Sequence, residues 1–417
     1  MSFIADKQTL DDLNLIGKYN NSSILHLFRG VKTRGGEKQL EQMFQFPLTD
    51  AEAINHRSSM FRYFGDKAFL FPFTGEQVDV AAAYLSSGGN ILQMKLQSYI
   101  GLPAAYEQLT EGLKATLKLL QTLKTFLQDI DQPDWDPVKR TLQNIPVAAA
   151  ELSLFNLLKY DRLIRHKLNR EVKEIMQAVY LLDVYISVSA IAVAKGFNYA
   201  QALPADKNII RVTGLYHPRL DKGITNNIAA DGNSNVIFLT GANMAGKSTF
   251  MKSFGISLYL AHMGFPVAAQ KMEFSVKDGI YSSINVPDNL SLGYSHFYAE
   301  VLRVKKVAQE VSTGKNLLVI FDELFKGTNV KDAHDATLSV SAAFSENRNC
   351  SFIISTHIIE VGEALKESCN NFQFVYLPTV MNGTVPTYTY KLQEGITEDR
   401  HGMMIIENEG ILGMILK

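Results

Sequence analysis

The sequence predicts an α-helical first part followed by an α/β second part with a mostly parallel sheet. Leucine-rich segments with a helical period run over 106–127 and 148–194. Between about 200 and 208 the pattern changes to short strands that alternate with helices, which is typical of a parallel sheet. We therefore expect a helical domain over 1–205 and an α/β domain over 206–417.

Turn signals separate the helices of the first part. Residues 49–52 (TDAE) have the form of a capping box that opens a helix, and 131–137 contains two prolines that predict a turn between helices. Trp135, the only tryptophan, lies in this turn, where a packed anchor is favoured over an exposed docking residue. The most apolar run, 184–194, is too short to cross a bilayer and predicts a buried helix.

Composition limits the classes of partner. The chain has 417 residues, which is long enough for two or three domains. Its 41 basic and 42 acidic side chains nearly cancel, so the net charge of the chain does not attract DNA. For the basic helix over 159–170, a solvated face is favoured over a phosphate-binding face. Cys350 and Cys369 form no metal-like cluster, and no signal peptide precedes the first helices, so we expect a cytoplasmic protein without a membrane segment.

A short apolar strand over 236–240 leads directly into the pattern G-x-x-x-x-G-K-[ST]. Gly241 and Gly246 allow the backbone to curl, so that its N–H groups and the N-terminus of the next helix face one anion. Lys247 is expected to reach the β- and γ-phosphates, and the hydroxyl of Ser248 to bind Mg²⁺. The pattern predicts a nucleotide triphosphate site rather than a glycine turn that merely ends a strand.

A second apolar strand, over 317–321, ends in two carboxylates. Such a strand is expected to be buried on both faces. Asp322 would hold Mg²⁺ directly or through water, and Glu323 would orient and deprotonate the attacking water. A base held for water favours ATP hydrolysis over the phosphorylation of a small molecule.

Two further side chains are candidates for the same site. His357 follows a third apolar strand, 351–355, where ligands bind in a parallel sheet, and it would contact the γ-phosphate. Gln270 follows the helix that leaves the phosphate loop and would contact the metal or its water. Later strands are expected over 372–377 and 387–392, where an antiparallel edge of the sheet is expected.

These motifs resemble the DNA mismatch-repair MutS ATPases, which are similar to ABC-type ATPases. The motifs that carry the resemblance are 240–251 (TGANMAGKSTFM), 288–300 (DNLSLGYSHFYAE), 322–328 (DELFKGT) and 355–357 (STH). Outside the ATPase half, 23–28, 33–40, 46–50 and 54–57 look like the start of the MutS core domain, and 177–183 and 198–199 resemble its end.

The resemblance implies that 1–205 is a MutS-like core with shortened levers and that 206–417 is a P-loop ATPase domain of ABC type, in which ATP lies between the two subunits of a dimer. The loop residues that would line the nucleotide are Gly241, Ala242, Asn243, Met244, Ala245, Gly246, Lys247, Ser248 and Thr249. Gly293 and Ser295 would complete the partner's site in trans. From spacing alone, 291–295 is better interpreted as a polar loop that caps a helix, and only the resemblance reverses this.

The chain departs from the family pattern in several places. Ala242 and Ala245 replace a proline and a glycine of the phosphate loop, and both are small enough to preserve it. Tyr294 and His296 replace a basic residue and a threonine in the trans loop, and the adenine-stacking aromatic falls near 223–224. The family's mismatch-reading, connector and terminal helix-turn-helix parts, and a full clamp, are not expected within this chain.

Three functions follow as expectations. The first is an ATP-hydrolysing, Mg²⁺-dependent homodimer that acts as a nucleotide-gated clamp, with DNA as its candidate cargo, without reading mismatches in the family's manner. The second is a nucleotide-gated scaffold that binds a protein partner and hydrolyses ATP slowly. The third is a protein that binds branched DNA or DNA junctions.

Overall fold

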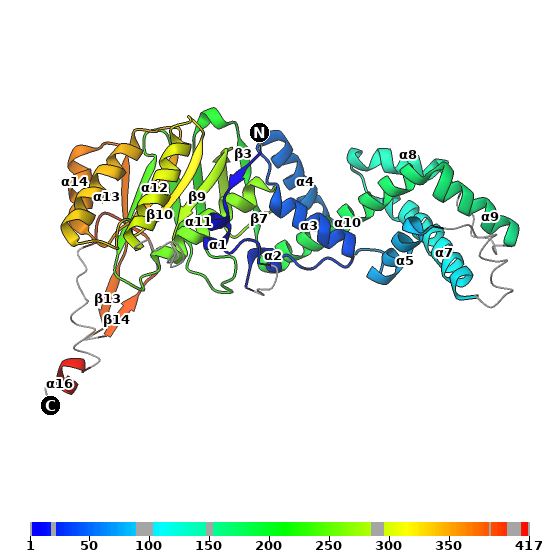
Figure 1. Ribbon diagram of the computed structural model, residues 1–417, viewed down its shortest axis with the longest axis horizontal. Helices are drawn as coiled ribbons and strands as arrows, with labels where there is room; N and C mark the ends of the chain where they lie inside the picture. The colour runs from blue at the N-terminus through cyan, green and yellow to red at the C-terminus, as the bar shows by residue number, and fades with distance from the viewer. Residues whose placement is uncertain are drawn as a thin grey trace. The chain divides into compact units, whose positions relative to one another are not determined.

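The computed structural model describes residues 2–17, 22–88, 103–146, 153–284, 296–382, 385–397 and 410–415. These residues form two compact units, whose elements are labelled in Figure 1. Unit 1 comprises Met1–Leu27, Phe44–Arg62 and Ala192–Lys417, and unit 2 comprises Phe28–Met43 and Tyr63–Ile191. The N-terminal segment lies in unit 1, whereas its sequence suggested the helical half. The domain boundary at 205 stays a prediction.

Unit 2 is helical, as the periodicity predicts. Its elements are α5 (Gly75–Ser86), α7 (Pro103–Phe126), η1 (Leu127–Asp129), η2 (Pro133–Trp135), α8 (Asp136–Asn144), α9 (Leu154–Arg162) and η3 (Leu163–Lys167). Three helices continue from one unit into the other: α3 (Arg34–Gln45), α4 (Ala51–Lys67) and α10 (Asn169–Lys195).

Turn chemistry sets the ends of these helices. The expected helix after 49–52 is present as α4, but Asp50 caps it, because the Ala53 N–H donates to the Asp50 carboxylate at 2.8 Å. The expected break over 131–137 is confirmed by η2. Trp135 is 3% exposed and packs edge-on against Phe64, so it is a packed anchor.

Among the described residues, one helix, α10, is long and apolar enough to cross a membrane by length and composition. Two thirds of its most apolar window (67%) are buried within the fold. Burial of this kind is typical of a core helix, which is what the run over 184–194 predicts.

Unit 1 contains a seven-stranded sheet that is parallel except at one edge. Its strands, in spatial order, are β1 (Ile4–Ala5), β9 (Gly279–Ser283), β10 (Leu317–Asp322), β11 (Ser351–Ser355), β6 (Val236–Gly241), β12 (Phe372–Leu377) and β15 (Gln393–Glu394). Among the strands that the structure describes in this sheet, β15 alone pairs antiparallel. The strands β6 and β11 are buried throughout, as expected for a parallel sheet with both faces covered.

Helices cover both faces of this sheet. Three helices lie beside the sheet on one face: α12 (His296–Val311), α13 (Val330–Ser345) and α14 (Ile359–Ser368) (Figure 1). Their apolar residues pack against alternate residues of β6, β10 and β11. On the other face lies α11 (Lys247–His262), where Gly255 stands close to Ile320 of β10. The expected helical-plus-α/β architecture is confirmed.

Smaller elements complete unit 1. They are α1 (Lys7–Asp12), α2 (Ile24–Leu27), β2 (Asn198–Tyr199), β3 (Gln201–Leu203), η4 (Ala205–Lys207), β4 (Ile210–Leu215), β5 (Asn226–Ala230), β7 (Pro266–Val267), β8 (Lys271–Ser275), β13 (Thr379–Asn382), β14 (Val385–Tyr388) and α16 (Ile411–Ile415). The strand expected over 387–392 is wrong in its bounds, because β14 ends at Tyr388 and the antiparallel edge is β15.

Candidate functional site

The glycine-rich loop joins β6 to α11 at the carboxyl end of the sheet. Gly241 and Gly246 have φ of 142° and 101°, a region that side chains rarely adopt. A Cβ at Gly246 would stand 2.9 Å from Tyr390 and one at Gly241 would stand 3.0 Å from the Leu377 carbonyl. Both positions therefore require glycine, as the phosphate-loop pattern predicts.

Lys247 opens α11 and turns its side chain back over the loop. Its ammonium donates to the carbonyls of Gly241 (2.8 Å) and Ala242 (3.1 Å), and the residue is 5% exposed. Burial lowers the pKa of Lys247, while the charges of Glu323 and Asp322 act in the opposite direction. A buried cation whose partners among the described residues are two loop carbonyls is a suitable donor for an anion that enters the loop.

Ser248 and Asp322 meet across the sheet edge. The Ser248 hydroxyl donates to Asp322 Oδ2 at 2.6 Å, and the Ser355 hydroxyl donates to Asp322 Oδ1 at 2.5 Å. Asp322 ends β10 and pairs in register with Ser355 at the end of β11. A hydroxyl and a carboxylate beside a phosphate loop are the oxygen ligands that Mg²⁺ uses when phosphates supply the rest, so these residues fit that ion.

Glu323 and His357 form the next pair along the same edge. The His357 Nε2 lies 2.5 Å from Glu323 Oε1, and the Lys326 ammonium lies 4.0 Å from Glu323 Oε2. Glu323 has a φ of 57°, and its N–H is held by the carbonyl and hydroxyl oxygens of Ser355. The hydrogen bond from His357 lowers the pKa of Glu323 and outweighs its burial, so the carboxylate stays ionised.

The remaining expected residues divide into three groups. Asn243, Met244, Ser248 and Thr249 are exposed on the loop and the first turn of α11, while Ala245 is buried. Gln270 is exposed after β7; its N–H donates to Thr213 O, and its side chain lies against Gly214. Among the described residues, no hydrogen bond or ion pair joins its side chain to Ser248 or Asp322. Gly293 and Ser295 lie outside the described residues.

A cavity of about 360 Å³ adjoins the loop, and sequence reasoning missed most of it. Residues from three distant segments line it: Leu215, Tyr216, His217, Leu220, Lys222, Gly223, Ile224, Asn226, Ala245, Gly246, Thr249, Phe250, Ser253, Leu377 and Tyr390. The amide of Asn226 donates to the Tyr390 carbonyl and its oxygen accepts from the Leu392 N–H. These bonds hold the Tyr390 ring against Gly246, so an aromatic ring borders both loop and cavity.

Comparison with known proteins relates the chain to one family. Residues 237–417 match the family described as MutS domain V. The chain is 29% identical over 242 residues to the DNA mismatch repair protein MutS of Wolbachia pipientis wMel, covering 57% of this chain and 28% of that protein. It is 26% identical over 265 residues to the protein of the same name from Streptococcus thermophilus (strain LMD-9), covering 61% and 30%. The chain thus spans about a third of the length of these relatives.

Proposed function

Because the chain belongs to the MutS family, we propose that it binds and hydrolyses ATP and acts as a nucleotide-gated dimeric clamp. One observation carries this proposal: the phosphate loop and the carboxylates at the end of β10 meet at one edge of the sheet, where Ser248 donates to Asp322. The resulting set of donors and acceptors is that of a P-loop nucleotide site.

Binding depends on the loop and on the cavity beside it. Lys247 would exchange its two carbonyl partners for the oxygens of the triphosphate. Ser248 and Asp322 would hold Mg²⁺, which when bound neutralises charge on the phosphates. The cavity lies on the α11 side of the loop, so it would take the base and ribose, with Tyr390 providing a ring for the base.

Hydrolysis depends on Glu323. Its ionised carboxylate accepts a proton from the attacking water, and the hydrogen bond with His357 fixes the carboxylate's orientation. His357 would also reach the γ-phosphate, and Gln270 would contact the ion or its water. In this arrangement Asp322, the last residue of β10, helps to bind the ion, and Glu323, the next residue, accepts the proton.

The site would be shared between two copies of the chain in the cytoplasm. Gly293 and Ser295 of a second copy would contact the γ-phosphate, so ATP would favour the closed dimer and hydrolysis would reopen it. The clamp's cargo would be DNA, since the relatives are named DNA mismatch repair proteins. In this proposal, exposed cations of the stretch 159–170 would contact its phosphates, in place of the solvated face that the sequence favours: Lys159, Arg162, Lys167 and Arg170.

A single experiment tests the clamp and its cargo. ATP turnover per subunit is measured over a range of protein concentrations, with duplex DNA, branched DNA or no DNA, at about 50 mM and 200 mM salt. We expect turnover per subunit to rise with protein concentration, because each site is completed in trans. Turnover independent of concentration would contradict the dimer.

The same measurement separates the clamp from the alternative, a scaffold for a protein partner. Phosphate contacts predict DNA affinity that falls steeply with salt. The near-zero net charge favours the scaffold, which predicts ATP turnover without DNA binding at either salt concentration. A preference for branched over duplex DNA would identify a junction binder.

The hydrogen bond from His357 gives turnover a predictable pH dependence. Glu323 acts as a base only when ionised, so turnover falls as pH drops through its pKa. Because His357 lowers that pKa, His357→Ala should raise it and move the acid limb of the kcat profile to higher pH. Lys326→Met removes a charge that lowers the pKa of Glu323 less than His357 does, so the acid limb should move less. If the acid limb stays at the same pH in His357→Ala, His357 does not set the pKa of the base Glu323.

A further inference from the structure

The N-terminal segment, residues 2–15, is built into the ATPase sheet. Strand β1 pairs parallel with β9, and the Ile4 N–H donates to the Asp278 carbonyl at 2.9 Å. Gly279 permits this approach, because a Cβ there would stand 2.4 Å from the Ile4 carbonyl oxygen. The segment therefore adds a strand beside β9, only one strand away from β10.

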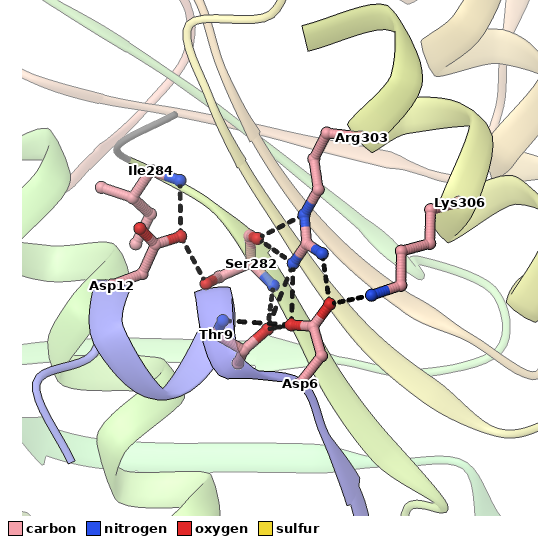
Figure 2. A network of polar contacts seen from close by, with 7 residues as sticks. All are labelled: Asp6, Thr9, Asp12, Ser282, Ile284, Arg303 and Lys306. Carbon is pink, nitrogen blue, oxygen red and sulfur yellow. Dashed lines mark hydrogen bonds and ion pairs between the residues drawn. The ribbon is translucent and has the colours of Figure 1, made fainter. Parts of the chain in front are cut away.

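Asp6 links this segment to α12. Its carboxylate accepts hydrogen bonds from Arg303 and from Lys306, the latter at 2.7 Å (Figure 2). Arg303 also donates to the Ser282 carbonyl through Nε at 3.0 Å, and its side chain is 5% exposed. Burial would raise the pKa of Asp6, but the bonds from Arg303 and Lys306 hold it well below its usual value. Asp6 is thus a permanent anion that joins β1 to α12.

The next turn of the segment holds the carboxyl end of β9. The Thr9 hydroxyl accepts from the Ser282 N–H at 3.0 Å. Asp12 Oδ2 accepts from the Ser282 hydroxyl at 2.7 Å and from the Ile284 N–H at 2.9 Å (Figure 2). One short helix, α1, therefore fixes both the end of β9 and, through Asp6, the helix α12.

This network stands at the functional edge of the sheet. Ser283 of β9 pairs in register with Phe321 of β10, so Ile284 lies level with Asp322. The same segment also contacts α11, the helix that follows the phosphate loop. The ring centroids of Phe3 and Tyr259 are 5.8 Å apart, and Leu13 lies against Gly255.

We propose that residues 2–15 are a positioning element of the ATPase, in which Asp6 and Asp12 hold α12 and the carboxyl end of β9 beside Asp322. The inference rests on the ATPase proposed above and assigns to that site residues more than two hundred positions away in sequence. In this proposal, Asp6 and Asp12 act without contacting the nucleotide. They act through the backbone at Ser282 and Ile284 and through the guanidinium of Arg303.

The test measures kcat and nucleotide affinity separately in variants of the full chain. Asp6→Asn keeps an oxygen that can cap α1 but loses the charge that holds Arg303 and Lys306. We expect its kcat to fall about 10-fold to 100-fold, because small displacements of catalytic groups have effects of this size. Its affinity for a non-hydrolysable Mg-ATP analogue should change less than about 2-fold, since the phosphate loop is untouched.

Two further variants provide reference values for this change in kcat. Lys306→Met removes only the ion pair of a half-exposed side chain and should leave kcat near that of the wild type. Arg303→Lys keeps a cation for Asp6 but loses the planar fork that also reaches Thr9 and Ser282, so its kcat should be intermediate. It also serves as the test variant if Asp6→Asn does not fold.

The outcomes separate this inference from the proposed ATPase. A wild-type chain that hydrolyses no ATP above the Glu323→Gln background would overturn the ATPase and the inference with it. A wild-type chain that turns over ATP, with unchanged kcat in folded Asp6→Asn and Arg303→Lys, would overturn the positioning role alone. A lower melting temperature with unchanged kcat would assign the network to stability only.

Discussion

Replacing Glu323 with glutamine should leave ATP bound and largely abolish its hydrolysis. The carboxylate is kept ionised by His357 and follows directly on the residue expected to hold the metal. Glutamine has nearly the same shape but accepts no proton from water. Loss of a general base typically costs about 100-fold to 10,000-fold, so kcat should fall within this range. Single-turnover phosphate release measures the chemical step, and binding of a fluorescent ATP analogue measures affinity.

Glu363→Gln is the matched control for this experiment. Glu363 is an exposed carboxylate on α14, so the same substitution there should leave kcat and affinity unchanged. Undiminished turnover in Glu323→Gln would remove Glu323 as the base. Loss of binding together with turnover would assign it to the phosphate site instead.

Replacing Lys247 with methionine should remove tight binding of the triphosphate. The ammonium is buried under the loop and, among the described residues, donates to two carbonyls that a phosphate can replace. Hydrogen bonds to charged groups contribute about 1.5 to 3 kcal/mol, so affinity for ATP should fall about 10-fold to 100-fold. The affinity for adenosine, which carries no phosphate, should change little. Isothermal titration with both ligands measures the difference.

Lys305 provides the control, because it is an exposed lysine on α12. Lys305→Met should bind ATP as the wild type does. Equal affinity for ATP in Lys247→Met and the wild type would contradict the assignment of the loop. An equal loss for ATP and adenosine would indicate that the substitution has collapsed the cavity.

The parts of the fold that sequence predicts are those encoded by local signals. The runs at 236–241, 317–322 and 351–355 are continuous and apolar, which is how buried parallel strands are recognised. Glycine spacing predicts the bend before Lys247, and its φ values bear that out. The meeting of Ser248 with Asp322 follows from the rule that parallel strands end at one edge.

The parts that sequence does not predict depend on distant segments. Strand β1 has only two residues, and it pairs because Gly279, far along the chain, leaves space for it. The cavity joins residues around 215–226 with Tyr390, whose backbone is held by Asn226. No local pattern marks such contacts. The start of α4 is a smaller example of what sequence does not predict. Thr49 and Asp50 are both suitable N-cap residues, and only the geometry shows that Asp50 caps the helix.

The most direct measurement is a crystal structure of the chain with Mg²⁺ and a non-hydrolysable ATP analogue. We expect the triphosphate within the loop at Gly241–Gly246, the ion on Ser248 and Asp322, and Glu323 facing the γ-phosphate, with the base in the cavity beside Tyr390. An analogue bound elsewhere, or carboxylates of Asp322 and Glu323 turned away from an occupied loop, would contradict it.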